Sequence, residues 1–493
     1  MLKDSRDLAL IINSKVPLIR LESFEEERAL QLLTRVGISQ SLPLYCWSVT
    51  EGLQRLGFGL EVGNQQHQEP DEVLEHIKKS RQPSLFVLCD FHPYLHNTPK
   101  ISRLLKDIAM RHATTPHTVV LLSHSIELPP ELNRFSAYFK LSLPDDADIQ
   151  KLIRAEAKHW SKQNPGSRVR SDNATMRKLV SNLRGMTNED TKRLIRGVIY
   201  DDGAITEEDI PELNKAKFEL MDMQGVLSFE YDTEKFSDVG GLNNLKKWLQ
   251  QRQQAFLNQQ EATIDAPRGI LLLGIQGGGK SLAAKAVAGL WGLPLLRLDF
   301  GALYNKFIGE SEKNLREALQ QAGLMSPCVL WLDELEKGLA NSDSDDGVSR
   351  RILGTLLTWM SEHKDPVFLV ATSNDISALP AELVRKGRFD EIFFVDLPDH
   401  EVRRDIFNIH LQRRQLPLDR FDLEALSELS EGFTGAEIEQ AVVSGLYSAA
   451  ARQQPLDTDL LSHELISTNP LSVTMAEPIA KLRHWAEERT VIA

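Results

Sequence analysis

One short stretch of the sequence has the residue types and the spacing to bind a chain of phosphates. It reads Gly274-Ile275-Gln276-Gly277-Gly278-Gly279-Lys280-Ser281 and fits the pattern G-x-x-x-x-G-K-[ST]. In that pattern, backbone N–H groups surround the phosphates, the lysine reaches the β- and γ-phosphates, and the hydroxyl binds Mg²⁺. We therefore expect this loop, together with Leu282, to bind a nucleotide with Mg²⁺.

The segments on both sides of this loop support that interpretation. An apolar segment from Arg268 leads into the loop, and an Ala-rich segment that begins at Ser281 leaves it. The first is typical of a buried strand and the second of a helix. A helix that begins at the glycine turn directs its first N–H groups and its positive dipole end at the phosphates. The alternative is a glycine-rich turn that fits the pattern by chance.

Two acids and an amide provide the groups that hydrolysis of a nucleoside triphosphate needs. Asp333 and Glu334 directly follow an apolar, strand-like segment, and Asn374 follows the next one. Ligands bind at the carboxyl ends of such strands. We expect Asp333 to hold Mg²⁺, commonly through water, Glu334 to act as the base that polarises the attacking water, and Asn374 to orient that water. The alternative is a solvated Asp-Glu pair at the end of a strand.

Composition limits the classes of function and partner. A chain of 493 residues is long enough for roughly three domains. The net charge of −13 argues against nucleic acid or an anionic membrane as a general ligand. The three cysteines lack metal-ligand spacing and are expected to be thiols in a reducing compartment. The first residues lack the apolar core of a signal peptide, and no apolar run suits a membrane span, so we expect a cytoplasmic location or the interior of an organelle.

The first third of the sequence follows the same plan as the second half. Residues 134–145 align without a gap with residues 388–399 and are identical at six of twelve positions. Upstream, residues 128–132 parallel residues 379–383, and strand-like segments match in the same order. This pattern predicts a duplicated domain. The alternative is two unrelated α/β domains that share common strand patterns.

The N-terminal copy lacks the residues that would act on a nucleotide. Its first expected strand, residues 16–21, is followed by Glu22–Glu25, a loop with neither glycine nor lysine. By sequence, Asp90-Phe91 of this copy corresponds to Asp333-Glu334, so a phenylalanine replaces the acid expected to be the base. His124 stands at the position of Asn374. We therefore expect this copy to be a degenerate module that cannot hydrolyse a nucleotide.

The order of apolar and polar segments predicts four regions. Residues 1–210 form the N-terminal module, including a small helical lid over residues 146–200. Residues 211–235 lack strong periodicity and are expected to be a connector. Residues 236–397 form the second α/β core, and residues 398–493 form a helical lid with a C-terminal helix. Strands that alternate with helices predict parallel sheets covered by helices on both faces.

From Phe236 to about Ala451 the sequence resembles an AAA ATPase, in the narrower AAA clade of the AAA+ superfamily. The resemblance rests on the phosphate loop, on the acidic pair, and on Arg385-Lys386-Gly387-Arg388, which is similar to a paired-arginine motif of that clade. It implies ATP as the nucleotide, a P-loop AAA+ fold with a lid, and arginines that reach the γ-phosphate bound by a neighbouring subunit. Hydrolysis would then require a homo-oligomer, most often a hexameric ring.

Further residues match motifs of this clade. Asp238 and Gly240 lie in a segment that resembles the adenine-side loop, and His410 matches the lid histidine near the adenine and ribose. Gly435 and Ala436 match the lid motif that replaces a sensor arginine. Ile275 and Gln276 depart from the prolines that the family often carries, which leaves the backbone donors but puts the nucleotide affinity in doubt.

A short aromatic segment resembles the first pore loop of AAA rings. It comprises Lys306, Phe307 and Ile308, and the resemblance implies that Phe307 grips a polypeptide in the channel of the ring. An isolated phenylalanine is otherwise usually part of a core. The acidic segment over residues 338–348 is either the second pore loop or a solvated surface loop.

The whole layout, with a degenerate module before an active one, resembles an AAA family first noted as a hypothetical reading frame of red-algal plastids and present in cyanobacteria and other bacteria. The implied function is an ATP-driven motor that remodels a protein substrate, with chaperone-like action. No His-Glu-x-x-His segment occurs, which excludes a fused zinc protease of that class. The alternative is an ATP-controlled assembly switch or scaffold that threads no substrate; salt-dependent DNA binding would favour a nucleic-acid motor instead.

Overall fold

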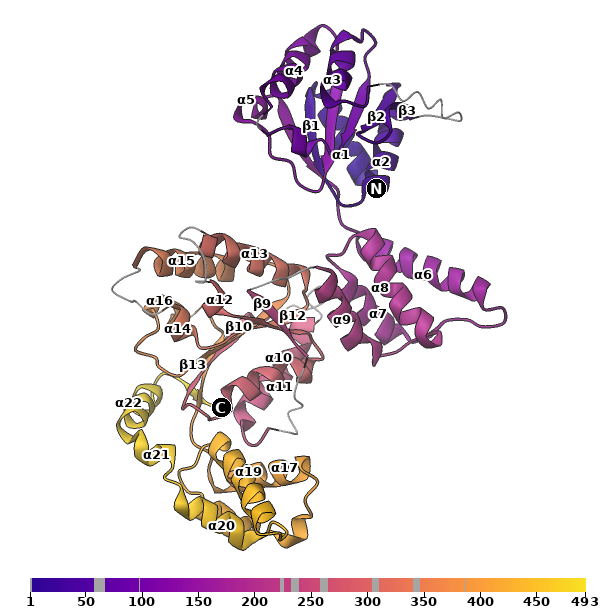
Figure 1. Ribbon diagram of the computed structural model, residues 1–493. Helices are drawn as coiled ribbons and strands as arrows, with labels where there is room; N and C mark the ends of the chain where they lie inside the picture. The colour runs from indigo at the N-terminus through magenta and orange to yellow at the C-terminus, as the bar shows by residue number, and fades with distance from the viewer. Residues whose placement is uncertain are drawn as a thin grey trace. The chain divides into compact units, whose positions relative to one another are not determined.

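The computed structural model describes residues 2–56, 67–96, 98–221, 226–231, 239–257, 265–303, 310–339, 346–385 and 387–493 (Figure 1). The chain divides into two compact units. The first comprises residues 1–145 and 186–191, and the second comprises residues 146–185 and 192–493. Among the described residues, no helix combines the length and the apolar content that crossing a bilayer requires.

The first unit is built on a six-stranded sheet with helices on both faces. Its strand order is β3-β2-β4-β5-β1-β6, in which β3 pairs antiparallel and the other strands pair parallel. The strands are β1 (Leu18–Glu22), β2 (Leu44–Ser48), β3 (Gly52–Leu56), β4 (Leu85–Cys89), β5 (Thr118–Ser123) and β6 (Ser136–Lys140). Helices α1 (Leu2–Asn13) and α2 (Glu26–Ser39) cover one face, and α3 (Pro70–Lys79), α4 (Pro99–Met110) and α5 (Pro130–Asn133) cover the other.

The second unit contains a seven-stranded sheet in the order β15-β14-β10-β13-β12-β11-β9. The strands are β9 (Leu227–Glu230), β10 (Gly269–Gly274), β11 (Leu295–Leu298), β12 (Cys328–Leu332), β13 (Val367–Ser373), β14 (Glu391–Val395) and β15 (Val491–Ile492). The helices are α10 (Asn243–Leu257) and α11 (Lys280–Trp291) on one face, and α12 (Phe300–Leu303), α13 (Glu310–Leu324), α14 (Leu335–Leu339) and α15 (Asp346–Glu362) on the other. Successive residues of β10 face opposite layers, since Leu272 packs with α11 and Leu271 with the α13 layer.

The two sheets share one order for five parallel strands. In the first unit these strands run β2-β4-β5-β1-β6, and in the second they run β11-β12-β13-β10-β14. In each case the order along the chain is the same, so the topology supports the duplication predicted from short sequence matches. The difference lies at the edge, where β3 follows its partner in the chain and β9 precedes its own.

The structure shifts the correspondence of the acidic residues by one position. The N–H of Asp90 donates to Leu122 O, two residues before His124, and the N–H of Glu334 donates to Thr372 Oγ1, two residues before Asn374. Both acidic residues also have a φ of +49°. Asp90 therefore stands at the position of Glu334 and not at that of Asp333. The shared backbone conformation shows this correspondence, whereas the residue type alone, aspartate, suggested Asp333.

The stretch predicted as a connector, residues 211–235, contains regular structure. Helix α9 (Asp209–Leu220) covers its beginning, and β9 joins the edge of the second sheet, antiparallel to β11. The apolar periodicity of α9 is weak because its buried side includes Asn214 and Lys217. Polar groups at buried positions hide a helix from a pattern based on hydrophobicity.

Lys217 attaches the helices before the ATPase-like core to that core. Its side chain is 1% exposed, and Nζ donates to Asn182 O, Arg184 O and Leu324 O at 2.9, 2.7 and 2.8 Å. The first oxygen lies in the last turn of α7 (Asn173–Leu183), the second directly follows that helix, and the third ends α13. With α6 (Asp146–Gln163) and α8 (Asn188–Asp202), α7 and α9 are the helices of this region.

The C-terminal residues form a helical lid and then return to the sheet. Helices α17 (His400–Arg413), α18 (Leu423–Leu429), α19 (Gly435–Ala451) and α20 (Thr458–Ser467) pack around one apolar cluster. After α21 (Leu471–Thr474), α22 (Ala476–Ala486) places Leu482 against Leu273 and Phe394 of the sheet. Strand β15 then pairs with β14, so the chain after the lid closes the edge of the core.

Candidate active site

The glycine-rich loop joins β10 to α11 and has the backbone that a phosphate cradle requires. Gly279 precedes α11 with a φ of +96°, and Gly277 has a φ of +76°. A Cβ at Gly277 would also lie 3.0 Å from Thr434 Oγ1, at the start of the lid helix α19. Only glycine adopts such a conformation without strain while tolerating the close approach of the lid.

The Lys280 ammonium is held by the loop itself. Nζ donates to Gly274 O at 2.9 Å and to Ile275 O at 2.7 Å. Burial lowers the pKa of Lys280 to about 8, and the nearby carboxylates of Glu336, Asp333 and Glu334 oppose that shift. The cation is thus poised at the phosphate loop, in a position to exchange carbonyl partners for phosphate oxygens.

Thr372, a residue that the sequence reasoning missed, connects the two acids after β12. Its hydroxyl donates to Asp333 Oδ1 at 2.7 Å and accepts from the Glu334 N–H at 3.0 Å. Arg297 Nη2 donates to the other Asp333 oxygen at 2.9 Å. Glu334 has left-handed backbone and its carboxylate lies 2.6 Å from Lys337 Nζ. A threonine within an apolar strand gives no signal in the sequence. Only the fold brings Thr372 of β13 beside the acids that follow β12.

Asn374 is fixed by an acid that was also missed. Its backbone N–H and its side-chain Nδ2 donate to Glu336 Oε1 at 3.0 and 3.1 Å. Glu336 is buried in the short helix α14, three residues after Asp333. One carboxylate oxygen thereby sets both the position and the orientation of the amide that faces the site.

The lid forms the opposite wall of the site. The N–H of Ala436, in the first turn of α19, donates to Gly277 O at 3.3 Å. His410 Nδ1 lies 3.6 Å from Glu439 Oε1, and burial lowers the pKa of His410. A Cβ at Gly240 would come within 3.0 Å of Ile406 Cγ1, so the lid packs closely against the segment after residue 238.

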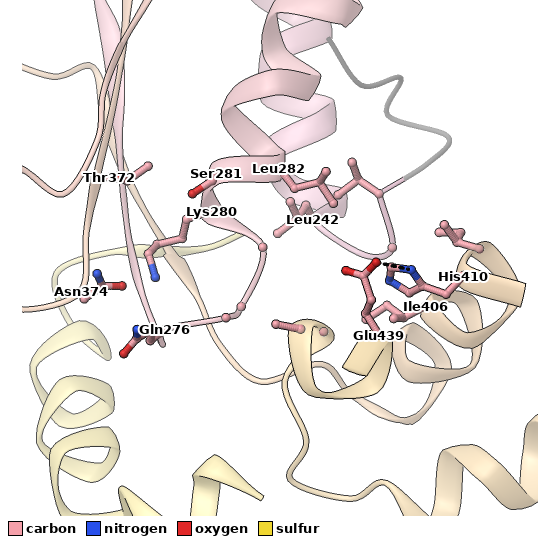
Figure 2. Close-up of a pocket in the computed structure, with 18 of the residues that line it drawn as sticks. Leu242, Gln276, Lys280, Ser281, Leu282, Thr372, Asn374, Ile406, His410 and Glu439 are labelled. Carbon is pink, nitrogen blue, oxygen red and sulfur yellow. Dashed lines mark ion pairs between the residues drawn. The ribbon is translucent and has the colours of Figure 1, made fainter. Parts of the chain in front are cut away.

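These groups surround one cavity of about 380 Å³ (Figure 2). Figure 2 shows Lys280, Thr372 and Asn374 on one side and Ile406, His410 and Glu439 on the other. The predicted site residues that line it are Gly240, Gln276, Gly277, Gly278, Gly279, Lys280, Ser281, Leu282, Asp333, Glu334, Asn374, His410, Gly435 and Ala436. Gly274 lies just outside, at the end of β10. Asp238, Lys306, Phe307 and Ile308 lie outside the described residues.

The paired arginines are placed elsewhere. Neither Arg385 nor Arg388 is among the described residues that line the cavity. Arg388 Nη1 donates to Leu357 O at 2.6 Å and to the hydroxyl of Ser361, both on α15. Arg388 is therefore held by α15 and is not part of the wall of the cavity.

The donors in the cavity suit a magnesium nucleotide. Ser281 offers a hydroxyl oxygen and Asp333 a carboxylate oxygen, and Mg²⁺ prefers such hard oxygen ligands alongside phosphate. The loop donors and Lys280 suit the phosphates, while Ile406 and Leu242 offer apolar surface for a base.

Three protein-family models match the chain in succession. Residues 4–141 match the N-terminal domain of SpoVK-like AAA ATPases, and residues 147–224 match the second domain of those ATPases. Residues 270–397 match the AAA family, the ATPases associated with various cellular activities. The predicted N-terminal module, residues 1–210, is thus matched by two domain models, with the division between residues 141 and 147.

Together, the fold, the cavity and these matches define an AAA ATPase. Along nearly its whole length the chain is similar to the AAA domain-containing protein ycf46. It is 35% identical to that of Trieres chinensis over 498 residues, 98% of this chain and 97% of the relative. It is 34% identical to that of Pyropia yezoensis over 489 residues, again 98% and 97%. The chain belongs to the ycf46 family of AAA ATPases, as the sequence resemblance indicated.

A shorter similarity extends to other AAA proteins. The chain is 36% identical to the cell division cycle protein 48 homolog of Archaeoglobus fulgidus over 244 residues, 48% of this chain and 33% of the relative. It is 34% identical to the proteasome-activating nucleotidase of Saccharolobus islandicus over 224 residues, 43% of this chain and 57% of the relative. These relatives and the AAA match support ATP hydrolysis as the activity of this chain.

Proposed function

We propose that this ATPase binds ATP with Mg²⁺ in the cavity between the phosphate loop and the lid, and that it works as an oligomeric motor that remodels a protein substrate. Lys280 and the loop N–H groups would hold the phosphates, and Ser281 and Asp333 would hold the metal. When bound, Mg²⁺ neutralises the charge that develops on the phosphates.

Glu334 and Asn374 are the groups suited to activate water. Both line the cavity, and Asn374 is fixed by Glu336. The Glu334 carboxylate is partly exposed and can leave Lys337, since an exposed ion pair of this kind contributes only about 0–1 kcal/mol. Glu334 would accept the proton of the attacking water, and Asn374 would hold that water in line with the γ-phosphate.

The separation of the arginine pair from the cavity is the observation that carries the oligomeric proposal. Phosphoryl transfer gains a large factor from an arginine that stabilises the transition-state charge. In this chain Arg388 is bound to α15 and does not line the cavity of its own subunit. A neighbouring subunit would supply Arg385 and Arg388, which couples hydrolysis to the subunit interface and favours the ring that the resemblance implies.

The remodelling activity is tested with a trapped ring. Glu334→Gln is expected to bind ATP without turnover and to hold a protein substrate, which can be captured and identified. Remodelling of that captured protein by the wild type is then compared with Phe307→Ala and with the matched Phe307→Tyr, which keeps an aromatic ring. Loss of remodelling with retained basal ATPase in Phe307→Ala alone supports threading. Equal activity of all three would instead support the assembly switch or scaffold.

Phosphate release tests the assignment of the base separately. Glu334→Gln keeps the size of the side chain but removes its basicity, so turnover should fall while ATP binding persists. Undiminished release by this variant would overturn the role of Glu334. Nucleotide binding that survives in Lys280→Ala would likewise remove the basis for the phosphate site.

A further inference from the structure

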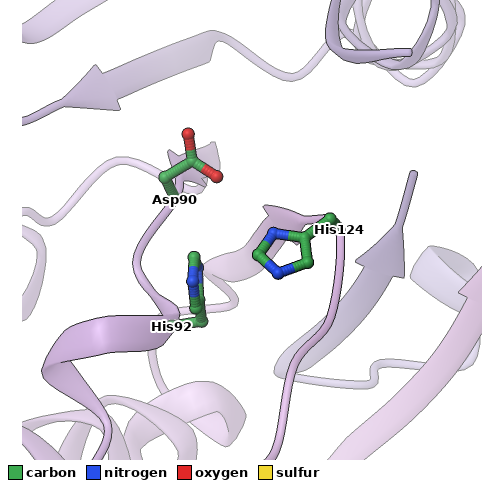
Figure 3. Close-up of side chains that lie close together, drawn as sticks. All are labelled: Asp90, His92 and His124. Atoms are coloured by element: carbon green, nitrogen blue, oxygen red, sulfur yellow. The ribbon is translucent and has the colours of Figure 1, made fainter. Parts of the chain in front are cut away.

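The first unit gathers a carboxylate and two imidazoles at one edge of its sheet (Figure 3). Asp90 directly follows β4, His92 lies two residues later, and His124 directly follows β5. Their ligand atoms all lie within 4.8 Å of one another. Asp90 and His124 are exposed and His92 is half-buried, so an ion in solution can reach the cluster.

This edge corresponds to the catalytic edge of the second unit. Asp90 stands at the position of Glu334 and His124 at that of Asn374, and Asp90 shares the left-handed φ of +49°. Such backbone strain persists where the surrounding structure fixes it, often at functional sites. The N-terminal copy therefore keeps a polar, pre-formed edge although the loop after β1 has no phosphate-binding residues.

A buried serine orders the cluster. The hydroxyl of Ser123, which is 4% exposed, lies 3.0 Å from Asp90 Oδ1, 2.8 Å from His92 Nδ1 and 3.4 Å from His124 Nδ1. The hydroxyl donates its single proton to Asp90 Oδ1 and therefore accepts from His92 Nδ1–H. That assignment leaves His92 Nε2 unprotonated, which is the form that binds a metal, and such outer partners orient metal ligands.

The nearby acid of the first strand is engaged elsewhere. Glu22 Oε1 accepts from the Ile126 N–H at 3.0 Å, and Oε2 accepts from Tyr138 OH at 3.0 Å. The Phe24 ring stacks on His124 with centroids 6.0 Å apart and supports that imidazole from the side. At this edge of the described structure, Asp90, His92 and His124 are thus the side chains that still offer an atom to bind a metal.

We propose that Asp90, His92 and His124 bind a divalent transition metal, with Zn²⁺ as the ion that suits two imidazoles and one carboxylate. Donors at tetrahedral angles and about 2.0–2.2 Å from Zn²⁺ lie roughly 3.4 Å apart. The exposed side chains of Asp90 and His124 can rotate to close the present 4.8 Å, while Ser123 holds His92. Three protein ligands leave one coordination position for water or a further ligand.

Zinc binding to the full-length protein tests the proposal, with metal content and calorimetric titration of ZnCl₂ as measurements. The wild type is expected to bind one Zn²⁺ per chain at this cluster, and His92→Ala and His124→Ala are expected to lose it. Ser123→Ala removes only the orienting hydroxyl and should weaken binding about 10–100-fold. Co²⁺ in place of Zn²⁺ should give the visible absorption of a low-coordinate site, absent in His124→Ala.

Two variants control for other zinc-binding groups. His76→Ala alters a second histidine pair, since the His76 and His67 rings have centroids 4.6 Å apart, and Cys46→Ser alters the thiol that lies 3.6 Å from Cys89 Sγ. Both controls should bind Zn²⁺ as the wild type does. Because His124 is exposed, its replacement should leave thermal unfolding of the metal-free protein unchanged. Equal Zn²⁺ binding by His124→Ala and the wild type, or no binding by the wild type, would overturn the site.

Discussion

Replacing Thr372 with valine removes one hydroxyl from the wall of the nucleotide cavity and keeps the shape of the side chain. Thr372 is 2% exposed, and its hydroxyl makes two hydrogen bonds, one to the Asp333 carboxylate and one from the Glu334 N–H. Both acids then lose the contact that joins the ends of β12 and β13. We expect Thr372→Val to fold and to bind ATP but to hydrolyse it slowly.

The size of the effect follows from the two bonds. A hydrogen bond to a charged group contributes about 1.5–3 kcal/mol, and one between neutral groups about 0.5–1.5 kcal/mol. If the sum, about 2–4.5 kcal/mol, is lost from the transition state, kcat falls roughly 30- to 2000-fold. A loss of alignment acts on kcat more than on nucleotide affinity, since the phosphate loop keeps its own donors.

Thr372→Ser is the matched control because it keeps the hydroxyl and removes only the methyl group. Steady-state ATP hydrolysis at saturating ATP gives kcat, and binding of a fluorescent ATP analogue gives the affinity. The serine variant should stay within a few-fold of the wild type. A Thr372→Val enzyme with wild-type kcat, or a serine variant as slow as the valine variant, would refute the reasoning.

Three further changes have defined outcomes. Lys217→Met should lower the free energy of unfolding by about 3–5 kcal/mol, because it leaves three carbonyl oxygens without their donor, whereas exposed Lys215→Met should change it by under about 1 kcal/mol in denaturant titrations. The pKa of Lys280 is about 8, and bound phosphate should raise it, so ATP affinity should stay constant below pH 8 and fall by up to about tenfold per pH unit above it. Lys280→Arg stays charged and should lack this loss of affinity at high pH. Gly277→Ala should weaken ATP binding by roughly 5- to 30-fold, the equivalent of about 1–2 kcal/mol of left-handed strain, with Gly197→Ala as a control at an unobstructed glycine.

The contiguous parts of the site could be predicted from sequence. The phosphate loop, with its strand and helix, and the acids after β12 are local patterns, and parallel strands bring their ends to one edge. Thr372 and Glu336 could not be found, because ordinary residue types acquire a role only through neighbours distant in the chain. The alignment of Asp90 with Asp333 was wrong by one residue, because the sequence does not show that Asp90 shares the positive φ of Glu334.

The fold was predictable to a similar depth. Alternating strands and helices gave the two sheets and the lid helices, whereas β9 was missed because it joins the edge of the sheet from before the phosphate loop and runs antiparallel. The buried Lys217 and Asn214 disguised α9 as a connector. In both cases tertiary contacts, and not local propensity, decide the structure.

The central claim is that each ATP is hydrolysed with arginines from a neighbouring subunit, and one mixing experiment tests it most directly. Lys280→Ala keeps its arginines but should not bind ATP, and Arg388→Ala should bind ATP but lack the arginine. Each variant alone should be inactive. In randomly mixed rings about a quarter of the interfaces combine an intact ATP site with an intact arginine, so an equimolar mixture should recover about a quarter of the wild-type rate per subunit. A mixture no more active than its two components would contradict the account.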